Sequence, residues 1–328
     1  MTYRQLNIEE REALQVMKWE KRSIRYMARV LKRQPSTISR ELERNSTTMY
    51  IPRKAQERAE RRIQERGHRL RLKDPRVRGY VERNLKRHWS PEQIAGRMHV
   101  VHPDWPLVSP EAIYQFIYAD ISINANASGD DLRQYLRRHH RIRKKKGAYH
   151  GNRGSIAGKI SIEQRPQEVE TRATFGHWEG DSIVSRQSLA RLNSLVERKS
   201  GLLKLSKIEN GTSAVTATVV VRRLKRVPQS FRRTMTVDNG HEHADHLNVT
   251  EKLGMAIFFC HVYCSSERGT NENTNGLVRE YFRKKTNFAL VSSADVARVE
   301  RALNCRPRKR LHYLTPLEVF NQGVALKG

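Results

Sequence analysis

Three carboxylates in the C-terminal half of the chain lie next to sequence that is expected to be buried, where a charged side chain is costly unless it has a function. Asp181 falls within a strand-like stretch, Asp238 ends a later one, and Glu272 lies in a helix-like segment, with 33 residues between the last two. An unpaired charge beside buried sequence is costly, and such groups commonly coordinate metal ions. If the three converge, we expect them to bind two Mg²⁺ ions about 3.5 to 4 Å apart and to support phosphoryl transfer, with Mn²⁺ able to substitute.

Each of these carboxylates, taken alone, has a simpler explanation. Asp238 precedes Asn239-Gly240 and fits a turn, whereas Glu272 fits a solvated helix residue and Asp181 a local cap. The three together weaken these explanations, because a single metal site accounts for all of them.

The stretch ERGTNENTNGLVREYF, residues 267–282, places residues that prefer caps and turns at the start of a predicted helix. On a helix, polar members three or four positions apart share one face and reach one site. We expect Glu272 to bind metal and the other members to hold phosphate or the strand that is cut: Arg268, Asn271, Asn275 and Arg279. A frayed, capped helix end is the alternative.

The elements around these residues predict an α/β domain at 171–328. Strands are expected at 176–184, in a hairpin over 193–208, and at 231–240 and 255–260, while helices are expected at 212–227, 243–254 and 267–282. The hairpin turns through Lys199, Ser200 and Gly201, and Gly254 closes the middle helix. This succession suggests a mixed sheet with a ribonuclease-H-like core.

The N-terminal part of the chain has a helical pattern. Apolar residues recur at helical spacing in 8–19 and from Ile24 onward, and a third helix follows Pro35 with Ser36 as the candidate N-cap. We interpret residues 1–48 as an all-α helix-turn-helix domain that binds DNA through its last helix. The residues expected to face outward and contact DNA are Thr37, Ser39, Arg40 and Arg44, while Ile38 and Leu42 face inward. An ordinary three-helix bundle with a charged face is the alternative.

Residues 49–120 form a second predicted helical region. Ser90 and Ser109 each precede a proline and are expected to cap the helices that follow, with Gln93 completing a capping box. The long connection between these helices leaves both a second helix-turn-helix and a plain helical subdomain open.

A basic, flexible linker is predicted over residues 121–170. Its charge run includes three consecutive lysines, Lys144, Lys145 and Lys146. This run is either a solvated tether or an arm that binds the DNA backbone, since clustered cations release counterions from phosphate.

The charge of the chain indicates a polyanionic partner. Its 328 residues contain 63 lysines and arginines against 34 acidic residues, a net charge of +29, so nucleic acid is the expected partner. No run approaches the roughly 18 apolar residues of a membrane span, and the N-terminus lacks the apolar core of a signal peptide. We therefore expect a cytoplasmic, nucleoid-associated protein without membrane contact. Three cysteines, an odd number, fit free thiols in a reducing compartment.

The sequence resembles the insertion-sequence 30 family of bacterial transposases over nearly its whole length. The resemblance rests on the segments FGHWEGDSI, VDNG, ERGTNENTNGLVREYF and RPRKRLHYLTPLEVF, and on SIRYMARVLKRQPSTISREL and WSPEQIAGR in the N-terminal half. It implies a DDE-type transposase with a retroviral-integrase-like core, in which Asp181, Asp238 and Glu272 hold the metal ions for strand cleavage and strand transfer. It also implies that the N-terminal region recognises terminal inverted repeats. Pairing two DNA ends requires a dimer or higher oligomer on double-stranded DNA.

Three departures from the family pattern lie near the carboxylates. Ser265 and Ser266 replace a proline and a tryptophan, His243 replaces an aromatic residue, and His261-Val262 replaces Asp-Pro. These changes leave open a catalytically inactive, sequence-specific DNA-binding repressor, and a metal-dependent nuclease acting on RNA is a third alternative. Six side chains also raise the question of zinc, although their spacing matches no standard finger: His241, His243, His246, Cys260, His261 and Cys264.

Overall fold

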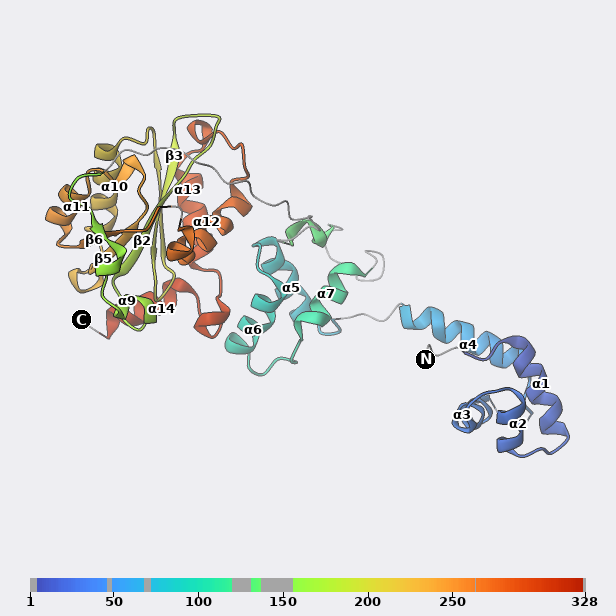
Figure 1. The fold of residues 1–328 in the computed structure, drawn as a ribbon. Coiled ribbons are helices and arrows are strands. Elements are labelled where there is room, and N and C mark those ends of the chain that lie inside the picture. The colour runs from blue at the N-terminus through green and yellow to red at the C-terminus, as the bar shows by residue number, and fades with distance from the viewer. Residues whose placement is uncertain are drawn as a thin grey trace. The chain divides into compact units, whose positions relative to one another are not determined.

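The computed structural model describes residues 5–45, 49–67, 72–119, 131–136, 156–262 and 264–326 (Figure 1). These residues form two compact units, one with helices α1 to α4 and the other with the elements from helix α5 onward. The lysines at 144–146 of the predicted basic arm lie outside the described residues. None of the described helices is both long and apolar enough to cross a membrane.

The described residues of the first unit form four helices: α1 (Ile8–Trp19), α2 (Ile24–Val30), α3 (Pro35–Asn45) and α4 (Pro52–Gly67). A capping box begins α1, and the Ser23 side chain caps α2. The three predicted helices are confirmed, but Ser36 is not the N-cap of the third. Pro35 already occupies the first helical position, which suits proline because the amide it lacks has no partner there.

The second unit begins with helices α5 (Pro75–Lys86), α6 (Pro91–Val101) and α7 (Pro110–Tyr118), which share one apolar core. Ser90 and Gln93 form the predicted capping box, and Ser109 Oγ accepts a hydrogen bond from Ala112 N at 3.1 Å. Both predicted caps are therefore confirmed. The short 3₁₀ helix η1 (Leu132–Tyr135) adds Leu132 to the same core.

Helix α6 is fixed to the C-terminal part of the same unit. Arg97 Nη1 donates to the Tyr313 carbonyl at 3.2 Å and to Glu318 Oε2 at 2.9 Å. The predicted helical region 49–120 is thus divided, because α4 belongs to the first unit whereas α5 to α7 belong to the unit that holds the sheet.

A six-stranded mixed sheet forms the centre of the second unit. Its strands are β1 (Ile160–Ser161), β2 (His177–Ile183), β3 (Arg191–Glu197), β4 (Leu203–Ile208), β5 (Thr234–Val237) and β6 (Ala256–Phe259). Their spatial order is β1-β6-β5-β2-β3-β4. Strands β2 to β4 are antiparallel neighbours, whereas β5 pairs in parallel with both β2 and β6, and β1 pairs in parallel with β6. This is the ribonuclease-H-like arrangement, so the predicted fold class is confirmed.

Helices cover both faces of the sheet (Figure 1). On one face lie α10 (Ser213–Leu224), α11 (His246–Leu253) and α14 (Pro316–Ala325), and on the other lie α12 (Gly269–Tyr281) and α13 (Ser293–Asn304). Successive strand residues alternate between the two cores: Leu195 of β3 packs with the first layer and Val196 with the second. The second layer places α12 against β2 and β3.

The sheet begins earlier in the chain than the predicted domain boundary at residue 171. Strand β1 pairs with β6, and helix α9 (Glu168–Thr171) follows it, within the segment predicted to be linker. A strand of two residues offers no alternation of apolar and polar positions to detect. The described residues 156–170 therefore belong to the unit that holds the sheet.

Candidate functional site

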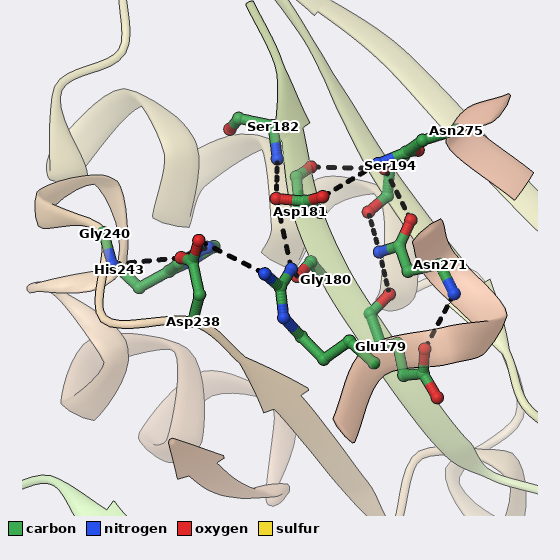
Figure 2. A network of polar contacts seen from close by, with 11 residues as sticks. Glu179, Gly180, Asp181, Ser182, Ser194, Asp238, Gly240, His243, Asn271 and Asn275 are labelled. Carbon is green, nitrogen blue, oxygen red and sulfur yellow. Dashed lines mark hydrogen bonds and ion pairs between the residues drawn. The ribbon is translucent and has the colours of Figure 1, made fainter. Parts of the chain in front are cut away.

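Asp181 lies on β2, and Asp238 directly follows the neighbouring parallel strand β5. Strand β2 pairs with β5 so that His177 faces Thr234, and the same register, continued beyond the end of β5, places Asp238 opposite Asp181. Adjacent strands are about 4.8 Å apart, so both carboxylates can reach one small volume. Figure 2 shows Asp238 in the loop beside the strand that carries Asp181.

The guanidinium group of Arg268 joins the two carboxylates. Its Nη1 lies 3.1 Å from Asp181 Oδ1 and its Nη2 lies 3.3 Å from Asp238 Oδ2. Nη1 also donates to the Gly180 carbonyl at 3.1 Å, and only 8% of the residue is exposed. Arg268 therefore neutralises an acidic pair, and its expected contact with DNA phosphate stays a prediction.

Asp181 is held by neighbours on β2 and α12 (Figure 2). Its Oδ1 accepts a hydrogen bond from Ser182 N at 2.9 Å, and its Oδ2 accepts one from Asn275 Nδ2 at 2.8 Å. Burial raises the pKa of Asp181, and the positive charge of Arg268 opposes this shift. The ionised carboxylate is thus costly at this position, and a cation beside it would stabilise it.

Glu272 lies on α12, the helix whose Asn275 contacts Asp181. It precedes Asn275 by three positions, a spacing that brings two residues to one side of a helix, whereas Arg268 is the N-cap that precedes α12. Its side chain is exposed, and within the described part of the chain it makes no hydrogen bond or ion pair. The structure therefore brings Asp181 and Asp238 together around Arg268, whereas the convergence of Glu272 with them stays a prediction.

Asn271 is an anchor of α12, which corrects its predicted role. It is fully buried, its Nδ2 donates to the Glu179 carbonyl at 3.1 Å, and its Oδ1 accepts from Ser194 Oγ at 3.0 Å. Its backbone amide donates to Glu179 Oε2 at 2.7 Å. Because these polar groups are used within the protein, Asn271 cannot bind DNA as expected. Glu179 and Ser194 were absent from the predicted set, since nothing in their local spacing points to α12.

Asn275 and Arg279 of α12 contact β2 and Val184, the residue that follows this strand. Asn275 reaches Asp181, and Arg279 Nη2 donates to the Val184 carbonyl at 2.7 Å. Both residues are partly exposed. Their expected contacts with DNA remain predictions, and the observed contacts fix the face of α12 that Glu272 shares.

The histidines and cysteines considered for zinc do not gather in one place within the described residues. His246 Nε2 lies 3.2 Å from the Gly158 carbonyl, whereas His261 lies between Glu163 and Glu267. Cys260 is buried, and burial raises the pKa of its thiol to about 12. A thiol that keeps its proton is a poor metal ligand.

His243 lies at the Oδ1 atom of Asp238, whereas Arg268 contacts Oδ2. Its ring is buried and its Nε2 lies 3.6 Å from Asp238 Oδ1. Burial lowers the pKa of His243, so the ring is held neutral. Together with Glu242, these residues form the group of three potential metal-ligating side chains that the described residues contain. The sequence marked His243 as a departure and left Glu242 unnoticed, because a turn of this kind is common without function.

The predicted DNA-contacting residues of the first unit share the outer side of α3. Ser39, Arg40 and Arg44 are exposed and Thr37 is partly exposed, whereas Ile38 is fully buried. Beneath them, Arg11 Nε donates to Glu41 Oε1 at 2.8 Å, and Tyr50 donates to the same oxygen at 3.3 Å. This buried ion pair fixes α3 relative to α1 and leaves its polar face open.

The chemistry of the donors at Asp181 and Asp238 fits hard divalent cations. The carboxylates of Asp181 and Asp238 both contact Arg268 and so face one volume, while the expected contribution of Glu272 as a third oxygen donor stays a prediction. Oxygen ligands of this kind suit Mg²⁺ and Mn²⁺. The positive charge that Arg268 places between the aspartates shows that this volume accommodates a cationic group.

Several known proteins are similar to this chain. Residues 2–45 match the family model of a helix-turn-helix domain. The chain is 35% identical over 319 residues to the transposase for insertion sequence element IS4351 of Bacteroides fragilis, covering 96% of this chain and 95% of that protein. It is 35% identical over 328 residues to the transposase InsI for insertion sequence element IS30A of Escherichia coli K12, covering 98% and 84%. The catalytic core domain of BIV integrase covers 46% of this chain and 97% of its own, with a TM-score of 0.37 and 18% identity.

Proposed function

Because the chain belongs to the insertion-sequence 30 family of transposases, we propose that it is a DDE-type enzyme that cuts and joins DNA through Asp181, Asp238 and Glu272. The observation that carries this proposal is that Asp181 on β2 and Asp238, the residue after β5, come together, with one guanidinium contacting both carboxylates. Such a pair, beside an exposed glutamate, is suited to phosphoryl transfer with divalent ions.

In this proposal, each residue of the site has a separate role in the reaction. Two Mg²⁺ ions, when bound, supply activation of the attacking oxygen and stabilisation of the leaving oxygen. Asp181 and Asp238 would hold them, and Asn275 orients Asp181 through its 2.8 Å hydrogen bond. Asn271 fixes α12 against β2. This contact would hold the helix that carries Glu272 in place relative to the strand that carries Asp181. No side chain needs to become bonded to DNA, because water or a 3′-hydroxyl attacks phosphorus in line.

Recognition of the terminal inverted repeats is assigned in this proposal to the helix-turn-helix domain. The exposed face of α3 carries Ser39, Arg40 and Arg44, and helices of this kind enter the major groove. The substitution Arg40→Ala should cost about 1 to 3 kcal/mol of binding to the inverted repeat and little for a scrambled duplex. Fluorescence anisotropy with both duplexes measures this difference. Lys145→Ala serves as the control, expected to weaken both equally, and an unchanged preference in Arg40→Ala would remove it from base reading.

A transposase joins two element ends to target DNA, so the working form should contain at least two protomers on double-stranded DNA. The net charge of +29 supports such binding to long stretches of phosphate. The site of action would be the nucleoid in the bacterial cytoplasm.

A DNA-binding repressor without catalytic activity is the second candidate. It is favoured by Arg268, whose side chain contacts both aspartates where metal would bind, and by the departures at Ser265 and Ser266. Such a protein would bind the inverted repeats and leave them uncut.

Replacing Glu272, the third carboxylate, distinguishes a transposase from a repressor. Glu272→Gln should abolish Mg²⁺-dependent cleavage and joining of an inverted-repeat duplex while end binding stays within about 2-fold of wild type, because the exposed side chain supports no fold contact. The matched control is Asn273→Gln, an exposed neighbour on the same helix, which should cleave normally. If wild type binds the repeat but cuts neither duplex nor nicked substrate, the repressor is the correct description.

A further inference from the structure

The two oxygens of Asp238 face different surroundings (Figure 2). Oδ2 lies 3.3 Å from Arg268 Nη2, on the side of Asp181. Oδ1 accepts a hydrogen bond from Gly240 N at 3.0 Å and lies 3.6 Å from His243 Nε2. The carboxylate therefore serves the proposed catalytic site with one oxygen and presents the other to His243.

His243 Nε2 is an unpaired polar atom in a buried ring. The residue is 5% exposed, and the atom has no hydrogen-bond partner within the described residues. Its distance to Asp238 Oδ1 is too long for a good hydrogen bond. Buried polar atoms are nearly always satisfied, so one that is aimed at a carboxylate without bonding it indicates a missing partner between them.

Glu242 completes a set of three around the same space. One ligand atom from each of Asp238, Glu242 and His243 lies within 4.8 Å of the others. Gly240 borders this space, since a Cβ at that position would stand 2.5 Å from Glu242 Oε2 and 2.9 Å from Asp238 Oδ1. Any larger residue would therefore press on both oxygens, and the glycine keeps the volume between them open.

The distances match those between ligands of one metal ion. Two ligand atoms that each lie about 2.1 Å from an ion are about 3.4 Å apart in tetrahedral geometry and about 3.6 Å apart at an angle of 120°. The separation of His243 Nε2 from Asp238 Oδ1, 3.6 Å, falls in this range. As a direct contact, the same separation is too long for a good hydrogen bond and is an ion pair only if the ring carries a proton.

We propose that Asp238, Glu242 and His243 form a binding site for a divalent transition-metal ion, with His243 Nε2 as its nitrogen ligand. Imidazole suits ions such as Zn²⁺, while carboxylates suit Mn²⁺ and Mg²⁺, so a mixed set favours Mn²⁺ or Zn²⁺ over Mg²⁺. The ion would hold Asp238 from the side opposite Arg268. This site goes beyond the proposed function, because the ion binds whether or not the protein cuts DNA.

Pulsed electron paramagnetic resonance of Mn²⁺ bound to the full-length protein tests the site directly, since it detects coupling to a ligating imidazole nitrogen. We expect this nitrogen coupling in wild type and in Asp181→Asn, which keeps all three proposed ligands. His243→Phe, which retains a buried ring, should lose the coupling. If wild type shows no nitrogen coupling, the proposal is wrong, however the variants fold. If Asp181→Asn loses the coupling, the metal site is not separate from the catalytic pair, which also contradicts the proposal.

Metal titrations add a second readout. His243→Phe should weaken Mn²⁺ binding at this site by at least about 10-fold, because it removes a ligand, and should change Mg²⁺ binding far less. His241→Gln is the matched control, an exposed histidine in the same short helix η4 (His241–His243), and should behave as wild type. Equal Mn²⁺ affinity in wild type and a folded His243→Phe protein contradicts the proposal. Glu272→Gln should keep the nitrogen coupling while losing cleavage. The coupling therefore tests the metal site, and cleavage tests the proposed function independently of it.

Discussion

At the scale of single residues, α12 depends on a polar side chain that sequence spacing could not assign. Asn271 and Glu272 are adjacent, yet the first is fully buried and the second is exposed. Helical spacing identifies residues that share a face, but it does not show which face packs against the sheet. The partners of Asn271 lie far away in the chain, at Glu179 and Ser194, so only the folded sheet shows which polar residue anchors the helix.

Replacing Asn271 tests this anchoring role. Asn271→Ala leaves the buried hydroxyl of Ser194 without one of its acceptors, and should lower the free energy of unfolding by about 2 kcal/mol. Asn273→Ala, on the exposed side of the same helix, should change it by about 0.5 kcal/mol or less. Thermal unfolding of both variants beside wild type measures the difference. Equal melting temperatures for the two variants would show that Asn271 does not anchor α12.

The acidic pair predicts a dependence of cleavage on pH. Burial raises the pKa of Asp181, and a carboxyl group must lose its proton to bind metal. Cleavage should therefore fall with decreasing pH already above the ordinary aspartate pKa of about 3.9. Arg268→Gln removes the charge that opposes the shift, so the acid limb of the pH–rate profile should move to higher pH. Arg279→Gln, which contacts Val184 and not Asp181, should leave the limb in place. An acid limb unmoved in Arg268→Gln would contradict the assignment.

At the scale of elements, the boundaries that carry local chemistry were predictable. Ser90 and Ser109 cap helices where their prolines indicated, and Gly254 ends α11 in the left-handed conformation. Ser36 was assigned wrongly, because its hydroxyl was weighed above the suitability of Pro35 for the first turn. Strand β1 escaped detection because its two residues depend on pairing with β6, which no local pattern encodes.

The candidate site shows the same limit. Two of the three expected carboxylates, Asp181 and Asp238, contact one guanidinium, while the convergence of Glu272 with them stays a prediction. The guanidinium between them and the histidine behind Asp238 depend on side-chain directions, which spacing along one element does not fix.

The packing of α6 against the C-terminal part of the second unit can be tested with paired glycine substitutions. A Cβ on Gly96 would stand 2.4 Å from ring atoms of Tyr313, whereas Gly79 on α5 has no atom within 4 Å of its Cβ position. Gly79→Ala should raise stability by up to about 1 kcal/mol through helix propensity. Gly96→Ala should lower it by about 1 to 3 kcal/mol, because the ring must move. Calorimetry compares them, and a stabilised Gly96→Ala protein would mean that α6 does not pack against Tyr313 in solution.

At the scale of the whole molecule, each of the two units carries a different surface that is proposed to act on DNA. The first unit presents α3 as the surface proposed to read DNA sequence, and the second unit contains the proposed site of bond breaking on β2, α12 and the end of β5. A net charge of +29 spread over both units provides affinity for the backbone without fixing the sequence. Specificity and chemistry are therefore separable, and variants of one should leave the other intact.

The measurement that tests the central claim most directly is Mg²⁺-dependent cleavage and joining of a labelled duplex carrying the inverted repeat that flanks this gene. Wild type is compared with Asp238→Asn, which keeps the shape of the side chain and removes its charge. We expect nicked and joined products from wild type, none from Asp238→Asn, and equal end binding by both proteins. Products from Asp238→Asn at the wild-type rate would contradict a catalytic role for the carboxylate pair on β2 and β5.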